Sequence, residues 1–198
     1  MSIVKLNNRS VKDITAFGSI SSLGSLTHIA TQTASSSASI SFTSGINSTY
    51  KEYIFYFVNM HPASASTFSF NGSIDSGSNY NVAKTSSSFY ALHKEDGSST
   101  ALSYNVYQDL AQGTGIQGLI GTLATDNDSG GSGFLHLFNP SSTTFVKHYI
   151  ANANGSNAQS VNSLTAGYFN TTSAVNAIQF SMSSGNIDSG QILLFGLN

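Results

Sequence analysis

A chain of 198 residues in which 39% are hydrophobic and only 8% are charged can build one sizeable core, and its sparse charge excludes a disordered polyelectrolyte. The formal net charge of −2 gives no attraction to nucleic acid, and the absence of cysteine excludes disulfides and thiolate metal sites. No stretch has the character of a signal peptide or a membrane span, so we expect a protein made in the cytoplasm, not exported by a classical route and not inserted in a membrane.

The first 35 residues differ in amino-acid composition from the rest of the chain. They contain three of the seven basic residues, Lys5, Arg9 and Lys12, and they end in a passage of small polar residues that starts at Thr31. Such composition is typical of a segment that docks elsewhere instead of joining a core. We therefore interpret residues 1–35 as an N-terminal arm and residues 36–198 as one β-sandwich domain.

Strand signals follow one another from Ser37 onward. Alternation of polar and apolar residues predicts a half-buried strand over Ser37–Phe42. Aromatic residues on both faces of Tyr50–Val58 predict a strand covered on both sides, in a sandwich core or at a subunit contact. Further strands are predicted over Thr67–Phe70, Ser88–Leu92, Ala101–Tyr107, Ile116–Leu123, Phe134–Phe138, Phe145–Ala151, Ser163–Phe169, Val175–Met182 and Gln191–Phe195.

Clusters of Gly, Asn and Ser separate these strands at short intervals, which favours an all-β, antiparallel sandwich of the jelly-roll kind over βαβ units. The best helical candidate, Val106–Ala111, is short and leads into Gly113 and Gly115, so it carries little weight.

Two glycine-containing motifs resemble ligand-binding loops. Gly113–Gly118 matches the G-x-G-x-x-G pattern of dinucleotide sites, but strand signals and Gly121 follow it where such a site needs a helix, so we predict a plain loop. Asp126 and Asp128 precede Gly130 as in a calcium loop, but Leu137 stands where the closing Glu would be, so an acidic turn is the preferred interpretation.

Histidines and carboxylates show no catalytic or metal-binding spacing. His136 and His148 lie on neighbouring predicted strands and can approach each other across a hairpin, yet no His-x-x-x-His pattern occurs. Glu95 and Asp96 belong to a predicted hairpin tip, and no Gly-x-Ser-x-Gly elbow is present. We predict no enzyme, and no catalytic, cofactor-binding or metal-binding residues.

Seven segments spread over the chain share a pattern of strands and turns. They are Lys5–Arg9, Val11–Thr15, Ala38–Gly45, Tyr50–Tyr56, His136–Ser142, Ala166–Thr172 and Ser189–Gly196. Together these segments resemble a family of small virion structural proteins of tailed bacteriophages, particularly marine and cyanobacterial phages. The usual final motif of that family has Tyr where this chain has Phe195.

The resemblance implies a structural role on the particle, in the tail or fibre apparatus or as a capsid decoration, and it implies location in the virion. From it we expect a homo-oligomer, with a trimer favoured, that joins other virion proteins through its N-terminal segment. The alternative is a receptor- or glycan-binding adhesin that uses the loops Asn71–Asn81 and Asp126–Gly133, with Tyr80 as its sugar-stacking candidate. A depolymerase is third, because no positioned carboxylate pair is evident.

Overall fold

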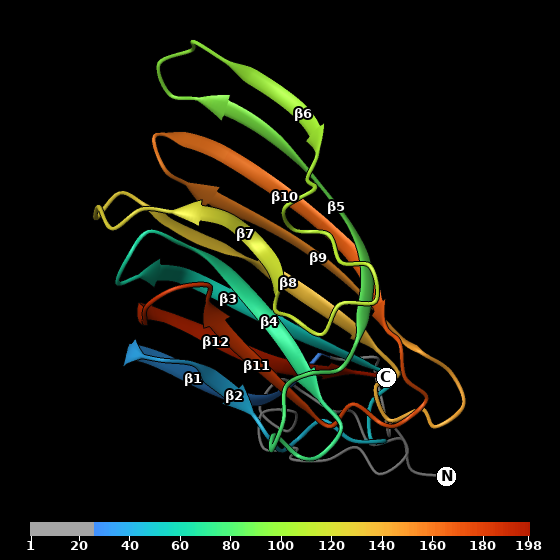
Figure 1. Cartoon of the computed structure of the whole chain (residues 1–198). Coiled ribbons are helices and arrows are strands. Elements are labelled where there is room, and N and C mark those ends of the chain that lie inside the picture. The colour runs from blue at the N-terminus through green and yellow to red at the C-terminus, as the bar shows by residue number, and fades with distance from the viewer. Residues whose placement is uncertain (1–25) are drawn as a thin grey trace, which may run out of the picture.

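A computed structural model describes residues 26–198, which form twelve β-strands in two antiparallel sheets (Figure 1). The predicted all-β, antiparallel sandwich is therefore confirmed. The strands are β1 (Thr27–Ser37), β2 (Ile40–Phe42), β3 (Glu52–Pro62), β4 (Ser66–Ser73), β5 (Lys84–Lys94), β6 (Thr100–Tyr104), β7 (Gln117–Leu123), β8 (Gly130–Phe138), β9 (Lys147–Ser156), β10 (Gln159–Phe169), β11 (Ala177–Met182) and β12 (Ile187–Leu197).

The two sheets differ in width. The large sheet has eight strands in the order β1-β12-β3-β8-β9-β10-β5-β6, and the small sheet has four in the order β2-β11-β4-β7. The chain crosses repeatedly from one sheet to the other, so sequence neighbours such as β3 and β4 belong to different layers. Because the small sheet is narrower, β5 and β6 extend past its edge strand β7 (Figure 1).

Each predicted strand corresponds to an observed one, with ends that differ by a few residues. The weak helical candidate Val106–Ala111 is instead part of the loop between β6 and β7. Glu95 and Asp96 lie at the tip of the β5–β6 hairpin, as predicted, where the Gly97 amide donates to the Lys94 carbonyl at 3.1 Å.

The predicted boundary of the arm is wrong. Residues 27–35 belong to β1, an edge strand of the large sheet that pairs with β12. Ala34 is buried in the core. The side-chain amide of Gln32 donates to the Ser41 carbonyl at 2.7 Å, which connects β1 to the small sheet. The outward positions carry small polar residues because an edge strand needs no apolar outer face. The remainder of the predicted arm, residues 1–25, lies outside the described residues.

The core lies between the sheets and is aromatic at its centre. Phe180 of β11 is fully buried, and its ring stacks on Phe68 of β4 at 5.7 Å between centroids, with an interplanar angle of 7°. Four further rings lie within 6.4 Å of it: those of Phe42, Phe55, Phe57 and Phe70. Within residues 26–198, no helix is long and apolar enough to cross a membrane.

Lys84, at the start of β5, is buried without a carboxylate partner within residues 26–198. Its ammonium donates to Asn71 Oδ1 at 2.5 Å and to the Val82 carbonyl at 3.1 Å, and it lies 5.6 Å from the ring centroid of Phe169. These neutral contacts do not replace the lost hydration, so burial lowers the pKa of Lys84 from 10.5 to about 8.

This buried lysine should make stability rise with pH. Between the folded pKa of about 8 and the unfolded value of 10.5, the unfolded chain binds the extra proton, so the free energy of unfolding increases with pH. We expect a gain of about 2 kcal/mol between about pH 8 and pH 9.5 in urea titrations, and expect Lys84→Met to remove it. Lys94→Met, at an exposed position, is the control. An unchanged gain in Lys84→Met would contradict the assignment.

Candidate functional site

The glycine motif leads into a strand, not a helix. Gly113 forms an isolated bridge with Lys84, and Gln117 and Gly118 already belong to β7. The predicted plain loop is therefore confirmed, and the strand-to-helix geometry that a dinucleotide pyrophosphate requires is not formed by these residues.

The first of the two predicted adhesin loops, Asn71–Asn81, uses its polar groups internally. Hydrogen bonds from the Ser73 hydroxyl and from Asn79 lower the pKa of Asp75 to about 2. The Tyr80 hydroxyl is buried and has no hydrogen-bond partner. Tyr80 is therefore only partly exposed, and its hydroxyl is not available to a ligand in this conformation.

The second loop, Asp126–Gly133, closes as an acidic turn. The Ser129 amide donates to the Asp126 carbonyl at 2.9 Å, and the Ser129 hydroxyl donates to the Ser156 carbonyl at 2.6 Å. A polar hollow of about 580 Å³ beside it contains Asp128 and His61, with His61 Nδ1 at 3.5 Å from an Asp188 carboxylate oxygen. Across residues 26–198, however, no three His, Asp or Glu side chains are grouped so as to hold a metal ion.

His136 and His148 lie on neighbouring strands of the same sheet face, but they are not opposite each other. His136 pairs with Ile150 across the β8–β9 ladder, and His148 lies two residues before Ile150 on β9. The ring of His136 is hydrogen-bonded to the Glu52 carboxylate, and the ring of His148 lies 5.9 Å from that of Tyr168. Each histidine thus has a packing or hydrogen-bonding role within the sheet surface.

The most prominent surface feature is the face of the large sheet that points away from the core, which we call the outer face. One cross-strand row runs through all eight strands, and six of its members are apolar or aromatic. The row is Thr31, Leu193, Tyr56, Phe134, Asn152, Leu164, Phe89 and Tyr104. The next row contains Phe195, Ile54, His136, Ile150 and Ala166.

These side chains pack against one another, and all but the buried Ile54 keep part of their surface open to solvent. The ring of Tyr56 lies 5.7 Å from that of Phe195 and 6.3 Å from that of Phe134. Phe89 and Ile150 keep 45% and 47% of their surface exposed. Contiguous exposed apolar surface is a common feature of association sites.

The outer face is also nearly free of charge. Among residues 26–198, Glu52 is the only Asp, Glu, Lys or Arg that borders the two rows at their centre, and it is hydrogen-bonded to His136. An apolar groove of about 570 Å³ crosses the face beside His148, Ile150 and Tyr168. A partner could therefore cover this surface without burying an unpaired charge, which is the usual obstacle to association.

The sequence indicated one part of this face. Tyr50–Val58 was predicted to be covered on both sides, and Tyr53, Phe55 and Phe57 indeed fill the core. Ile54 and Tyr56 point to the outer face, where the predicted subunit contact remains a prediction. Contributions from β5, β9 and β10 were missed, because they become visible only once the strands are in register.

Searches with the whole sequence and structure against family models, curated proteins and solved structures found no match.

Proposed function

We propose that this chain is a non-enzymatic structural component of a tailed-phage virion that assembles into a homotrimer through the outer face. The observation that carries the proposal is the continuous, uncharged aromatic surface across the large sheet. A second copy offers the same chemistry, and a net charge of −2 opposes self-association only weakly. Burial of aromatic surface between copies would stabilise a particle protein that has no disulfides.

Strand order supports the proposal further, because we interpret the sandwich as a modified jelly roll. The small sheet β2-β11-β4-β7 corresponds to one four-stranded layer of that fold, and β3, β8, β5 and β6 correspond to the other. In this interpretation, the β8-β9-β10 meander replaces a single strand, and β1 and β12 widen the large sheet. Jelly rolls are common among viral capsid and lectin domains.

The proposed location is the particle surface, in the tail or fibre apparatus or as a capsid decoration. The resemblance of segments such as Ala166–Thr172 and Ser189–Gly196 to phage structural proteins supports this part of the proposal. Contact with other virion proteins is assigned to the N-terminal segment, whose basic residues are Lys5, Arg9 and Lys12.

Light scattering on the purified chain tests the assembly. We expect a mass of about three times 20.8 kDa, and we expect the trimer to rebind phage particles that lack the protein. A chain that stays monomeric over a hundredfold range of concentration would overturn the assembly proposal. A trimer that fails to join particles would overturn the virion location and leave self-association intact.

A further inference from the structure

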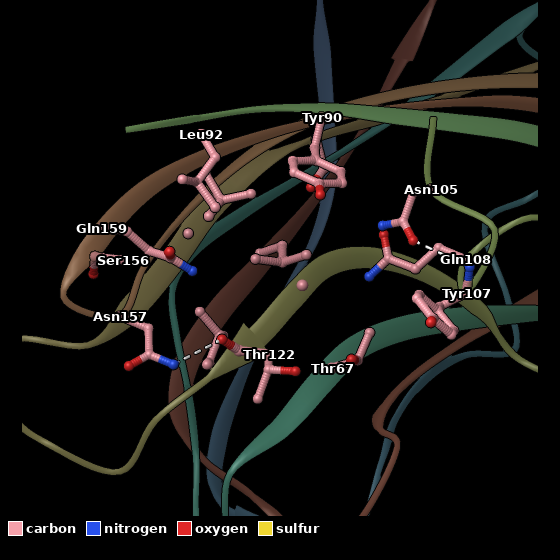
Figure 2. A pocket seen from close by; sticks show the side chains of 16 residues that line it. Thr67, Tyr90, Leu92, Asn105, Tyr107, Gln108, Thr122, Ser156, Asn157 and Gln159 are labelled. Carbon is pink, nitrogen blue, oxygen red and sulfur yellow. Dashed lines mark hydrogen bonds between the residues drawn. The ribbon is translucent and has the colours of Figure 1, made fainter. Parts of the chain in front are cut away.

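A second surface feature lies on the opposite side of the large sheet from the outer face. Where β5 and β6 extend past the small sheet, a cleft of about 400 Å³ opens between β7 and the inner face of β5 and β10. Figure 2 shows Tyr90 and Leu92 on one wall and Thr67 and Thr122 on the other, with Tyr107 and Gln108 at one end and Ser156, Asn157 and Gln159 at the other. Its volume is within the range of about 300–1,000 Å³ typical of small-molecule sites.

The cleft is uncharged, and its lining is about half polar and half apolar. None of the 16 residues that line it is Asp, Glu, Lys, Arg or His. Amides and hydroxyls supply its polarity, with Asn105, Gln108, Asn157 and Gln159 as the amides. Such groups offer both donors and acceptors, which is the complement that a ligand rich in hydroxyl groups needs, whereas an ionic ligand would lack a counter-charge.

Two buried oxygens in the cleft have no hydrogen-bond partner among residues 26–198. They are Gln108 Oε1 and Ser163 Oγ, in residues that are only 8% and 2% exposed. A buried polar atom without a partner costs about 1–3 kcal/mol, so its persistence in a cleft points to a bound group that completes it. Both atoms can accept a hydrogen bond from a ligand hydroxyl.

Two tyrosines add aromatic surface. Tyr90 is the cross-strand neighbour of Ser163 and points to the same inner face. Tyr107 lies at the mouth of the cleft and is 94% exposed, so the folded chain itself makes little use of its ring. An aromatic face with a polar tip beside open space suits the apolar C–H face of a sugar ring.

The loop that carries Tyr107 and Gln108 is fixed before any ligand binds. The Asn105 amide donates to the Ser88 carbonyl at 2.8 Å, and the Leu110 amide donates to the Ser86 hydroxyl at 3.0 Å. Gln108 packs over Gly118, where a Cβ would lie 2.8 Å from its side chain. A site held this way loses little conformational entropy on binding.

We propose that this cleft binds a neutral saccharide, with Tyr107 and Tyr90 against the sugar ring and Gln108 Oε1 and Ser163 Oγ accepting hydrogen bonds from its hydroxyls. The site lies away from the outer face and does not depend on the oligomeric state. This cleft is a different location from the loops Asn71–Asn81 and Asp126–Gly133, and from Tyr80, which the sequence indicated for an adhesin.

Saturation-transfer NMR and calorimetry test the site with a panel of glucose, galactose, mannose, N-acetylglucosamine, maltotriose and cellotriose, and with sialyllactose as an acidic control. We expect at least one neutral sugar to bind and sialyllactose not to bind. Tyr107→Ala should weaken the binding about two- to tenfold. Absence of binding by every neutral sugar, or preference for the acidic one, would overturn the proposal.

Blocking variants locate the binding. Gly121 lines the cleft, and a Cβ there would meet no atom within 4 Å, so Gly121→Leu is expected to obstruct the cleft and abolish binding without disturbing the fold. Gly115→Leu, also in open space but outside the lining, is the matched control. Binding that survives Gly121→Leu would place the sugar elsewhere and overturn the assignment.

Ser163→Ala separates a ligand role from a structural one. Because the Ser163 hydroxyl is buried without a partner among residues 26–198, its removal should raise the melting temperature of the free protein while sugar binding weakens. Ser88→Ala is the comparison, since the Ser88 hydroxyl is hydrogen-bonded to Thr165 Oγ1 at 3.0 Å and its loss should lower the melting temperature. Unchanged sugar binding in Ser163→Ala would contradict the role of this oxygen.

A cell-binding experiment identifies where the sugar comes from. If the cleft binds free sugars, labelled protein should bind intact host cells and fail to bind cells stripped of surface polysaccharide when that polysaccharide supplies the sugar.

Discussion

Replacing Phe180 by alanine is expected to lower the free energy of unfolding by about 3–5 kcal/mol. Phe180 is fully buried, and five phenylalanine rings surround it within 6.4 Å. It therefore joins both sheets at their centre, and alanine would leave a cavity that rigid neighbouring rings cannot fill. Urea unfolding, followed by circular dichroism at a fixed protein concentration, measures the loss.

Phe145→Ala is the matched control for this substitution. Phe145 is 70% exposed in the loop between β8 and β9, so the same change of side chain should cost less than about 0.5 kcal/mol there. A loss below about 1 kcal/mol in Phe180→Ala would show that the two sheets are not held together by this aromatic cluster.

Ile150→Lys is expected to convert the proposed trimer into a monomer. Ile150 lies at the middle of the outer face, opposite His136 on β8 and Ala166 on β10. A lysine there would be buried without a partner in every copy of the assembly, at a cost of several kcal/mol each. In the monomer the same ammonium stays in water, so the fold should be retained. Light scattering gives the mass, and circular dichroism checks the fold.

Phe145→Lys provides the control for Ile150→Lys, because it adds the same charge at an exposed position outside the outer face. We expect it to keep the mass of the parent protein. An Ile150→Lys variant that also keeps that mass would exclude the centre of the outer face as the contact. Retention of the NMR sugar signals in the monomer would show that the cleft acts independently.

The sequence contains enough information for the strands and the sandwich. Runs such as Tyr53–Val58 and Ile178–Met182 are apolar enough to predict strands and a core, and the turn signals follow one another at short enough intervals to predict a sandwich. β1 was missed because small polar residues on an edge strand give the same local signal as a linker. Its pairing with β12 depends on contacts such as that of Gln191 with Thr33, which are 158 residues apart.

The candidate sites were harder to predict for a related reason. The outer face exists only because Leu193, Tyr56 and Phe134, from three different strands, fall in one register. The cleft depends on the extra width of the large sheet and on Gln108, which lies in a segment with a weak helical signal. Loop composition alone directed attention to Tyr80, whose hydroxyl is in fact buried.

The position of β12 between β1 and β3 has a consequence for biosynthesis. Among residues 26–198, β1 has no other partner in the large sheet, so this strand must wait for Ile187–Leu197, which is synthesised much later. Pairing over such a long separation is slow, because the entropic cost of closing the loop arises before the stabilising contacts form. Completion of the large sheet therefore waits for β12, and until then β3, which carries the core residues Phe55 and Phe57, is unpaired along the edge that β12 later occupies.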